Sequence, residues 1–521
     1  MWELIIAPLF TILAIWTWQI FNWVWLKPKK IERLFRQQGM KGHSYKLLFG
    51  EMKEAKLMYD EVYSKPIGID DDILPRLMPN MLDTIAKYGD YSFTWLGPRP
   101  RVYIMDHNLF KEMMSNYRKY HKSFDVINPI AKMLISTGLA SMEGDEWAKS
   151  RSKLNPAFHM NKLKPTLPAV QVCCENILSE WKEMTKSGGN CVIDVIHHLE
   201  IYTSSVLAQV MFGSTYTDKI KQVFFQLLEL ESLGKLATDV FTLPGQKYYP
   251  TKKNRKAHEI DKFIRDSFKS MIHERLENRK AGADVDKRQD DLLDLFMDEL
   301  YDEKTSNVKN HSKLVADVIG QLKIFFFAGF GSTSNTICWT MVMLSVHKEW
   351  QDRARQEVMQ VIGDDNEITT NHLGQLKVIT MIVYEVLRLY PPTMEISRLI
   401  VEETKIGKYT IPKGTLMTCP ILLLYRSTEV WGHDAKKFNP ERFEDGVAKA
   451  TRNNGSAPYL PFGWGPRICI AQNLAMLELK VFLASMLRKF SFDLAPSYRH
   501  APHVDFTIHP QYGAPFVLTQ L

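Results

Sequence analysis

Hydrophobic residues recur at helical spacing through most of this chain of 521 residues. From about Leu109 onward, apolar side chains return every three to four positions, which is the spacing of an amphipathic helix. Strand-like segments are short: two strands around a Gly-Pro turn within residues 91–105, and further strands over residues 401–417 and 506–518. Residues 279–291 are charged without an apolar rhythm, which predicts a solvated surface loop. Because no repeat, low-complexity segment or convincing linker follows residue 60, the pattern predicts one large, mainly helical domain with a small β portion.

The amino-terminal stretch differs from the rest because it carries no charge. The run from Leu4 to Leu26 is rich in Leu, Ile, Phe and Trp and, at about 1.5 Å per residue, is long enough to cross a bilayer. It lacks the cleavage site of a signal peptide, and its tryptophans and basic flank favour a membrane anchor over a buried core helix. The positive-inside rule places the rest of the chain in the cytosol, because basic residues follow the run at once, namely Lys27, Lys29, Lys30, Arg33 and Arg36. We expect an anchor over residues 1–27, a linker and membrane-proximal segment over residues 28–60, a globular domain over residues 61–521, and no second span.

Composition and charge exclude several classes of protein. The chain is 45% hydrophobic and 24% charged, which is ordinary for a globular protein with a large core. Its net charge of +7 is spread along the sequence, which argues against nucleic-acid binding. The six cysteines show no framework spacing, which fits a reducing compartment better than a secreted disulfide scaffold.

The strongest chemical signal lies in residues 461–473, whose sequence is PFGWGPRICIAQN. Its glycines and prolines exclude regular structure up to the cysteine, and a leucine-rich run then predicts a helix. Cys469 therefore lies just before a helix N-terminus, where free backbone N–H groups and the helix dipole stabilise a thiolate. Arg467 adds a cation that favours the thiolate or meets an anionic group of a cofactor. A lone thiolate makes a poor zinc site and suits a metal already held by a macrocycle, of which haem is the main example. The alternative to a metal ligand is a structural role, in which Cys469 is buried as a small apolar residue.

The pattern Phe-Gly-x-Gly-x-Arg-x-Cys closely resembles the haem-binding loop of the cytochrome P450 superfamily, the haem-thiolate monooxygenases. The family usually has glycine two residues after the cysteine, and Ala471 is the smallest departure from it. The resemblance covers essentially the whole chain, with four motifs in the family's order and spacing. It implies the P450 fold, a haem-thiolate catalytic domain over residues 61–521, haem b as cofactor and Cys469 as the iron ligand.

Three more residues resemble the family's haem propionate ligands. Trp147 and Arg151 are four residues apart in a predicted helix, and an indole N–H and a guanidinium both donate to carboxylates. Arg398 follows two prolines at the family spacing and is a further candidate. Together with Arg467 and Cys469, these residues make up the cofactor-binding set that the resemblance implies.

Glu385 and Arg388 lie one helical turn apart in an apolar segment, which predicts a buried pair that needs a further partner. With Arg442 they resemble the structural Glu-Arg-Arg triad of the family. The resemblance implies that this triad is scaffold behind the haem, with no direct part in the chemistry.

The long apolar helix expected over residues 314–345 departs most from the family. The family pattern Ala-Gly-x-(Asp or Glu)-Thr-(Thr or Ser) combines a glycine that opens room beside the iron with an acid and an alcohol that deliver protons. This chain has Gly331 at the acid position and Ser332 at the threonine position, followed by Thr333. Ser332 and Thr333 are therefore the candidate catalytic residues for oxygen activation.

Three interpretations of this departure stay open. Proton delivery through Ser332, Thr333 and water would give a slower hydroxylase. The protein would otherwise use an oxidative rearrangement without acid-assisted oxygen activation, or act by binding alone. Glu395, in a segment that lines the substrate pocket in the family, either supplies the missing carboxyl, pairs with a polar or cationic group of the substrate, or points away from the pocket.

Within the superfamily, the chain looks like the plant clan that includes secologanin synthase and the enzymes that inactivate brassinosteroids. The resemblance implies an NADPH- and O2-dependent monooxygenase of the endoplasmic reticulum membrane that oxidises a terpenoid or steroid-like metabolite or hormone. Its partners would be a small apolar substrate and the membrane-bound NADPH–cytochrome P450 reductase, with Lys149, Lys153 and Lys437 as basic contacts. The competing hypotheses are a haem-thiolate isomerase or lyase and a non-catalytic haem protein that binds a ligand.

Overall fold

The computed structural model describes residues 2–122, 124, 129–135, 138–186, 189–213, 218–234, 249–280, 291–294, 308–363, 365, 367–451 and 459–521. The side chains of residues 2–9 lie outside this description, as does most of the charged segment 279–291 that the sequence predicts to be a surface loop.

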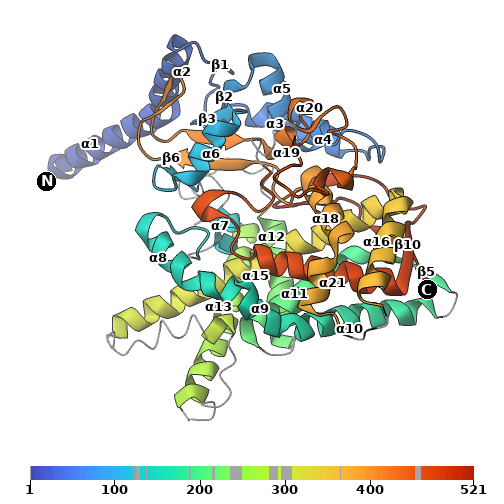
Figure 1. The fold of residues 1–521 in the computed structure, drawn as a ribbon. Coiled ribbons are helices and arrows are strands. Elements are labelled where there is room, and N and C mark those ends of the chain that lie inside the picture. Colours follow the sequence, from blue (N-terminus) through green and yellow to red (C-terminus); the bar gives the residue numbers. More distant parts are fainter. Residues whose placement is uncertain are drawn as a thin grey trace.

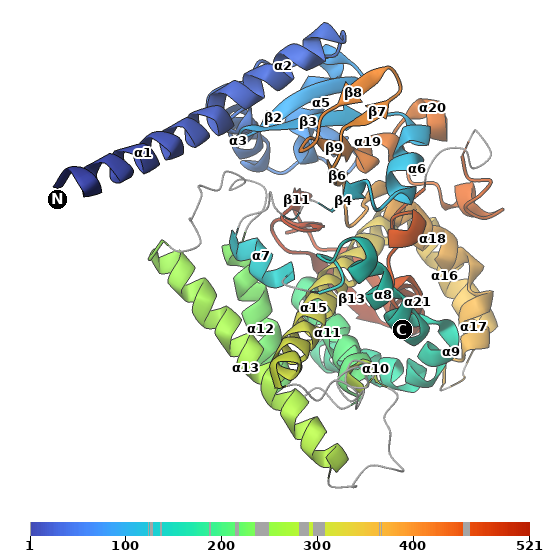
Figure 2. The same cartoon turned by 90° about the vertical axis from the view of Figure 1, so that its left-hand side faces the viewer.

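Most of the chain is helical, which confirms the predicted fold class (Figure 1). The larger helical part surrounds one apolar core, and α15 (Val308–Val346) runs through its middle against α11 (Val195–Phe212), α18 (Lys377–Leu389) and α21 (Gln472–Lys489) (Figure 2). The helix predicted over residues 314–345 is thus confirmed and begins six residues earlier. The other helices of this part are α7 (Pro129–Ile135), α8 (Gly144–Leu154), α9 (Met160–Leu163), α10 (Leu167–Thr185), α12 (Asp218–Leu233), α13 (Lys252–Lys280), α16 (Lys348–Val361), α17 (Thr370–Gln375), α19 (Ile421–Tyr425) and α20 (Thr428–Trp431). The helix α6 (His107–Ser115) packs in a second apolar core together with the sheet.

A six-stranded sheet forms the smaller part, with the strand order β1-β2-β3-β9-β6-β4. Its strands are β1 (Lys41–Gly42), β2 (Tyr91–Leu96), β3 (Arg99–Ile104), β4 (Tyr120–His121), β6 (Ile396–Ile400) and β9 (Leu416–Cys419). β2 and β3 confirm the two strands predicted within residues 91–105. The strands predicted over residues 401–417 are confirmed by β7 (Thr404–Ile406), β8 (Tyr409–Ile411) and the start of β9. β6 is an additional strand that lies before residue 401.

The tail closes the fold against the helical part. β13 (Pro515–Gln520) lies between β10 (Phe490–Leu494) and β5 (Asn190–Asp194), while β11 (Pro502–Val504) and β12 (Ile508–Pro510) form a separate hairpin. The prediction of strands in the tail is confirmed, with the hairpin beginning before residue 506.

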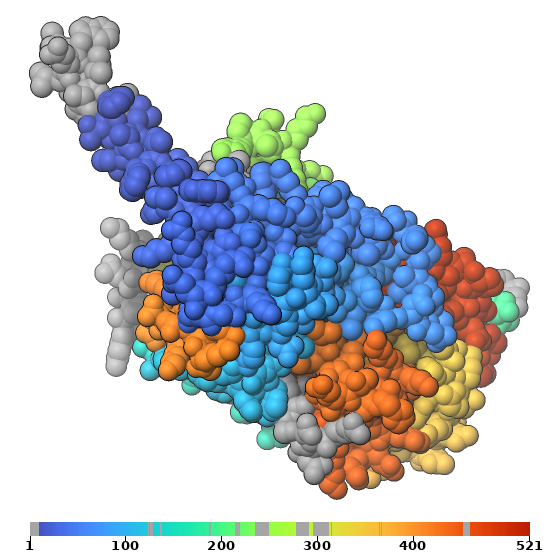
Figure 3. All heavy atoms as spheres, turned by 90° about the horizontal axis from the view of Figure 1, so that it is seen from above, coloured from blue at the N-terminus to red at the C-terminus, as the bar shows by residue number. Residues whose placement is uncertain are grey.

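The amino-terminal helix projects away from the body (Figure 1, Figure 3). α1 (Trp2–Phe21) continues through a π-helical turn (Asn22–Leu26) into α2 (Lys27–Gln37), and the helices α3 (Met52–Tyr63), α4 (Leu74–Leu77) and α5 (Pro79–Tyr88) follow. On α1, Phe10 is 74% and Trp16 is 64% exposed, although both are large apolar side chains. The segment predicted as a linker is helical at its start, and the Phe35 ring packs on Phe93 of β2 at a centroid distance of 5.2 Å.

One helix in the described part of the chain is long and apolar enough to cross a membrane, and it is internal. Residues 315–346 of α15 meet that criterion, and 56% of their most apolar window is buried inside the protein. The expectation that no second stretch is long and apolar enough to span a membrane was therefore wrong, because α15 meets that criterion by length and composition. Its burial inside the protein identifies α15 as a core helix. An amino-terminal membrane span stays a prediction.

Candidate functional site

The cysteine loop has the irregular backbone that its glycines and prolines predict. Gly463 and Gly465 have φ angles of +80° and +69°, which L side chains rarely adopt. A Cβ atom on Gly465 would lie 2.7 Å from the carbonyl oxygen of Met114, so glycine also permits the close approach of α6. The backbone N–H of Cys469 donates to Phe462 O at 2.7 Å, and α21 begins three residues after the cysteine. The predicted place of Cys469 just before a helix is confirmed.

Ala471 explains why the departure from the family's glycine is tolerated. Its φ angle is −93°, an ordinary value for an L residue, so the position has no need of glycine. Its backbone N–H acts on the thiol of Cys469, as do the cations of Arg151 and Lys122, and all three lower the pKa of the thiol. Removal from bulk water is the largest influence and raises that pKa.

Cys469 opens onto a cavity of about 440 Å³ between the cysteine loop and α15. Each residue that the sequence nominates for the cofactor or the chemistry lines this cavity, namely Trp147, Arg151, Ser332, Thr333, Arg398, Arg467 and Cys469. Segments more than 300 residues apart in the chain therefore meet at one place. Parts of the loops 120–139 and 227–249, in which substrate contacts were expected, lie outside the described residues.

The wall of the cavity carries an excess of buried positive charge. Its cations are Lys122, Arg151, Arg398 and Arg467, whereas the acidic residue among the described lining residues is Glu478. Burial raises the pKa of Glu478 well above its ordinary value, which favours its neutral form. The cavity therefore favours an anion.

The pKa values of these cations report the same imbalance. Burial and then the charges of Arg398 and Arg467 lower the pKa of Lys122 to about 7. Burial and then the charge of Arg467 lower the pKa of Arg398 to about 10. Because cations that face one another in a buried site repel, a bound anion would reverse both shifts. Lys122 was missed by the sequence analysis, since it follows a two-residue strand with no motif around it.

Arg467 makes three contacts with its surroundings and still has guanidinium N–H groups without a partner among the described residues. It donates to Met142 O at 2.8 Å, forms an ion pair with Glu143, and stacks over Trp147 with its Cζ 4.5 Å from the ring centroid. Its Nε and Nη1 atoms are buried without a hydrogen-bond partner among the described residues. Unsatisfied buried guanidinium donors next to a cavity are typical of an anion-binding site.

One face of α15 forms the opposite wall. Ala328, Gly329, Ser332, Thr333 and Thr336 line the cavity at helical spacing. Ser332 Oγ donates to Ala328 O at 2.9 Å, which leaves its oxygen lone pairs as acceptors. A Cβ on Gly329 would lie 2.8 Å from both terminal methyl groups of Leu207, so this glycine also permits close packing of α11.

Gly331 does not line this cavity. A Cβ on Gly331 would meet Thr507 Oγ1 at 3.9 Å, in the turn of the β11–β12 hairpin. A side chain at this position would therefore leave the helix toward the hairpin.

Glu395 lines a second cavity of about 560 Å³, which shares Lys122 and Arg398 with the first. Its carboxylate pairs with Arg101 Nη2 at 2.6 Å and accepts no hydrogen bond from Ser332 or Thr333 among those the structure records. Of the three interpretations of Glu395, the structure thus favours a partnered residue in an adjoining cavity over a substitute for the missing acid.

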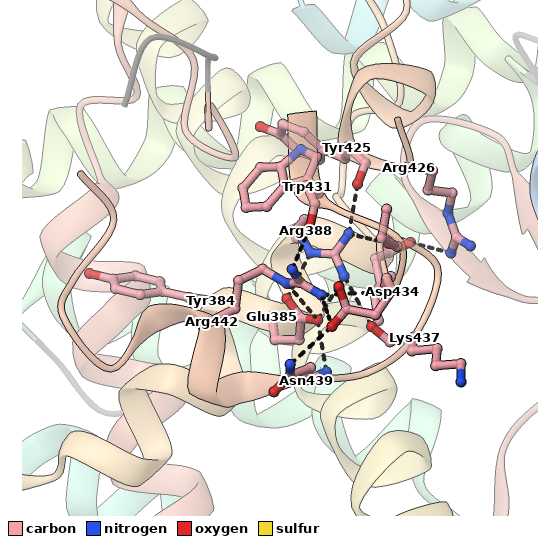
Figure 4. Close-up of polar contacts among 12 residues, drawn as sticks. Tyr384, Glu385, Arg388, Tyr425, Arg426, Trp431, Asp434, Lys437, Asn439 and Arg442 are labelled. Carbon is pink, nitrogen blue, oxygen red and sulfur yellow. Dashed lines mark hydrogen bonds and ion pairs between the residues drawn. The ribbon is translucent and has the colours of Figure 1, made fainter. Parts of the chain in front are cut away.

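The predicted triad is formed between α18 and residues 425–442 (Figure 4). Glu385 and Arg388 are fully buried and share two hydrogen bonds of 2.7 Å, and Arg442 Nε lies 3.7 Å from Glu385 Oε1. Arg442 pairs more closely with Asp434, at 2.8 Å. None of the three lines the cavity, which agrees with a structural role.

Comparison with known proteins agrees with this arrangement. The sequence profile of the family "Cytochrome P450" matches residues 76–510. The chain belongs to the cytochrome P450 family. It is 43% identical over 520 residues to secologanin synthase 2 of Catharanthus roseus, covering 99% of this chain and 97% of that protein.

Two more relatives share this degree of similarity. Cytochrome P450 CYP72A219 of Panax ginseng is 45% identical over 505 residues, covering 97% of this chain and 96% of the relative. 7-Deoxyloganic acid hydroxylase of Catharanthus roseus is 41% identical over 508 residues, with the same two shares. The chain is therefore a cytochrome P450 monooxygenase whose relatives include enzymes named for iridoid metabolites.

P450 enzymes carry a haem-thiolate cofactor, and the residues of this chain fit that group. A thiol just before a helix N-terminus suits an axial iron ligand. Haem also carries two propionate carboxylates, which match the buried cations and the unsatisfied donors of Arg467. The cavity thus offers both parts of the required donor set.

Proposed function

We propose that this P450 oxidises a terpenoid or steroid-like metabolite, with Cys469 as the thiolate ligand of haem iron. The observation that carries the proposal is the shared cavity, in which the Cys469 thiol, a cationic wall and the hydroxyls of α15 face one space. Relatives at 41–43% identity are named for iridoid chemistry, which supports the terpenoid class. Apolar lining residues, including Leu207, Val210, Phe325 and Ile421, suit such a substrate and exclude water.

Seven polar residues of the cavity have a definable part. Trp147, Arg151, Arg398, Arg467 and the newly identified Lys122 would hold the propionates. The bound haem supplies the activation of dioxygen. Ser332 and Thr333 would hold a water at their hydroxyl oxygens. Because Ser332 donates its own proton to Ala328 O, its oxygen would accept a hydrogen bond from that water, and Ser332 would pass a proton onward only after it releases the bond to Ala328.

The lining of α15 supports a second candidate function. Among its described residues, those that line the cavity offer hydroxyls and no carboxylate, and position 331 faces the hairpin instead of the cavity. This arrangement suits an isomerase or lyase, which rearranges its substrate without proton delivery to oxygen. Such a reaction would proceed without net consumption of NADPH.

The electron supply and the membrane are further parts of the proposal. We infer that α1 anchors the protein in the endoplasmic reticulum membrane, because its apolar side chains are exposed and basic residues follow it. Electrons would come from NADPH through the membrane-bound reductase. Lys149, Lys153 and Lys437 are exposed, as a docking contact requires.

A reductase titration tests the docking proposal. Replacing Lys149, Lys153 and Lys437 with alanine should raise the reductase concentration needed for half-maximal rate, and added salt should narrow the difference from wild type. Lys262→Ala, at an exposed position on α13, is the matched control.

The reaction is tested in microsomes that hold the protein and its reductase, with a panel of iridoids, triterpenes and steroids. Product mass and hydrogen peroxide are followed with and without NADPH, and Gly331→Glu and Gly331→Ala are run in parallel. A product one oxygen heavier that forms only with NADPH supports the monooxygenase. A product of unchanged mass that forms without NADPH supports the isomerase or lyase, and a spectral shift on ligand addition with no product supports a binding protein.

A further inference from the structure

Two histidines and an aspartate meet at the β11–β12 hairpin, and neither the sequence motifs nor the cavity of Cys469 includes them. His503 and His509 are direct cross-strand partners, so their side chains leave the same face of the hairpin. Asp505 lies two residues after His503 along the chain, in the turn. The register of the hairpin therefore brings the three side chains together.

The distances within this cluster are close to those of a metal site. His503 Nδ1 lies 4.0 Å and His509 Nε2 lies 3.8 Å from Asp505 Oδ2, and the ligand atoms of the three residues lie within 4.8 Å of one another. Zinc–ligand bonds of about 2.0–2.1 Å at tetrahedral angles imply ligand separations of about 3.3 Å. The side chains thus need to move by only part of an ångström each. They are 17%, 30% and 19% exposed for His503, His509 and Asp505, so an ion can enter from solvent.

The tautomer of His509 is set for binding a cation. Its Nδ1 lies 3.2 Å from Thr507 O, and because a carbonyl oxygen only accepts, this nitrogen must carry the proton. In the neutral ring the lone pair is then on Nε2, the atom that faces Asp505. A backbone carbonyl that fixes the other ring nitrogen is the usual arrangement behind a metal-bound histidine.

We propose that His503, Asp505 and His509 bind one divalent transition-metal ion, with Zn2+ as the best-matched ion. Two imidazole nitrogens and one carboxylate suit zinc and its neighbours, whereas calcium and magnesium prefer an all-oxygen set. Three protein ligands leave one tetrahedral position for water or a carboxylate of a small molecule.

The hairpin turn also contacts α15, so the site lies beside the catalytic cavity. Phe506 packs edge-on against Phe327 with a centroid distance of 4.9 Å, and Asn335 Nδ2 donates to Thr507 Oγ1 at 2.9 Å. Asp505 and Phe506 line the cavity of about 560 Å³ that adjoins that of Cys469. A metal ion would therefore fix the turn that borders both Gly331 and this second cavity.

Zinc binding to the full-length haem-loaded protein tests the proposal, with no histidine tag on the chain. Three proteins are compared: wild type, the hairpin variant His503→Gln/His509→Gln, and the matched control His273→Gln/His433→Gln. The two histidines of the control are exposed and lie outside the hairpin. Each protein is treated with a chelating resin and then dialysed against ZnCl2, and its bound zinc is measured. We expect wild type and the control to bind one more zinc ion per haem than the hairpin variant. Equal zinc content in all three would overturn the proposal and leave only histidine–carboxylate ion pairs.

Asp505→Asn gives a second test that does not depend on the folding of the double variant. It keeps both imidazoles and the size of the side chain while removing the anionic ligand. Titration calorimetry with ZnCl2 should show weaker binding than in wild type, with an unchanged haem absorption spectrum. Unchanged affinity for zinc would count against a site built on Asp505.

Discussion

The guanidinium of Arg388 donates two hydrogen bonds of 2.7 Å to the carboxylate of Glu385, and neither side chain is exposed to solvent. Arg388 also donates to Tyr425 O at 2.6 Å and Lys437 O at 3.1 Å, and Asn439 N donates to Glu385 at 2.9 Å. The pair thereby ties α18 to the long segment that precedes the cysteine loop (Figure 4).

Glu385→Gln should cost about 3–5 kcal/mol in the free energy of unfolding, because it leaves the charge of Arg388 buried without a counter-charge. The denaturant midpoint at which haem absorbance is lost measures this cost. Glu183→Gln is the control, since its pair with Lys186 has the same spacing and is exposed, so that its loss should cost about 1 kcal/mol or less. Equal midpoints for the two variants would show that the buried pair has no special role.

Lys122→Met should speed the loss of haem to an excess of apomyoglobin. A hydrogen bond to a charged group contributes about 1.5–3 kcal/mol, so we expect a change of about tenfold or more. Lys149→Met removes an exposed lysine of α8 and should leave the transfer rate unchanged. If both variants lose haem at the wild-type rate, Lys122 has no part in holding the cofactor.

Gly331→Ala should stabilise the protein more than Gly329→Ala does. Alanine is favoured over glycine inside a helix by about 0.5–1 kcal/mol, and both positions lie within α15. At position 329 the new Cβ meets the terminal methyl groups of Leu207 at 2.8 Å, so this side chain must turn away and the gain is offset. At position 331 the nearest atom is Thr507 Oγ1 at 3.9 Å, so the gain should remain. Chemical denaturation of the two variants measures the difference, and a Gly329→Ala variant at least as stable as Gly331→Ala would contradict the packing described.

Glu200→Gln should stabilise the protein in a pH-dependent way. Burial and then the charge of Asp194 raise the pKa of Glu200 from 4.5 to about 7. The folded state therefore holds a proton that the unfolded chain releases, so wild type loses stability as the pH rises through this range. The gain of the variant over wild type should be absent below pH 4.5 and complete above pH 7.

Denaturation midpoints at about pH 4 and about pH 8 measure this gain. Glu274→Gln, at an exposed position on α13, should show no such trend. A gain in stability of Glu200→Gln that is larger at about pH 4 than at about pH 8 would contradict the raised pKa of Glu200.

Much of the cofactor site could be predicted from sequence because its constraints are local. Gly463 and Gly465 are required by the backbone of the cysteine loop. Trp147 and Arg151 share a helix face because they are four residues apart, wherever that helix packs in the fold. Lys122 could not be predicted, since its pKa and its part in the cavity arise only when Arg398 and Arg467 are folded against it.

Features that depend on strand register or on the direction of a side chain also could not be predicted from the sequence. Gly331 is one residue from Ser332, yet a single step along a helix turns the side chain away from the cavity and toward Thr507. Glu395, directly before β6, forms an ion pair with Arg101, which lies on β3. The cluster of His503, Asp505 and His509 becomes visible only once the hairpin register pairs the two histidines.

The central claim is that Cys469 is the ligand that makes this cavity a haem-thiolate site. The absorption spectrum of the reduced protein with carbon monoxide tests it most directly, because the position of the band would depend on the residue that the protein supplies to the haem iron. Cys174→Ala, at a buried cysteine of α10, serves as the control. Wild type and Cys174→Ala should show the band of thiolate-ligated haem and Cys469→Ala should lack it, whereas a thiolate band that persists in Cys469→Ala would contradict the account.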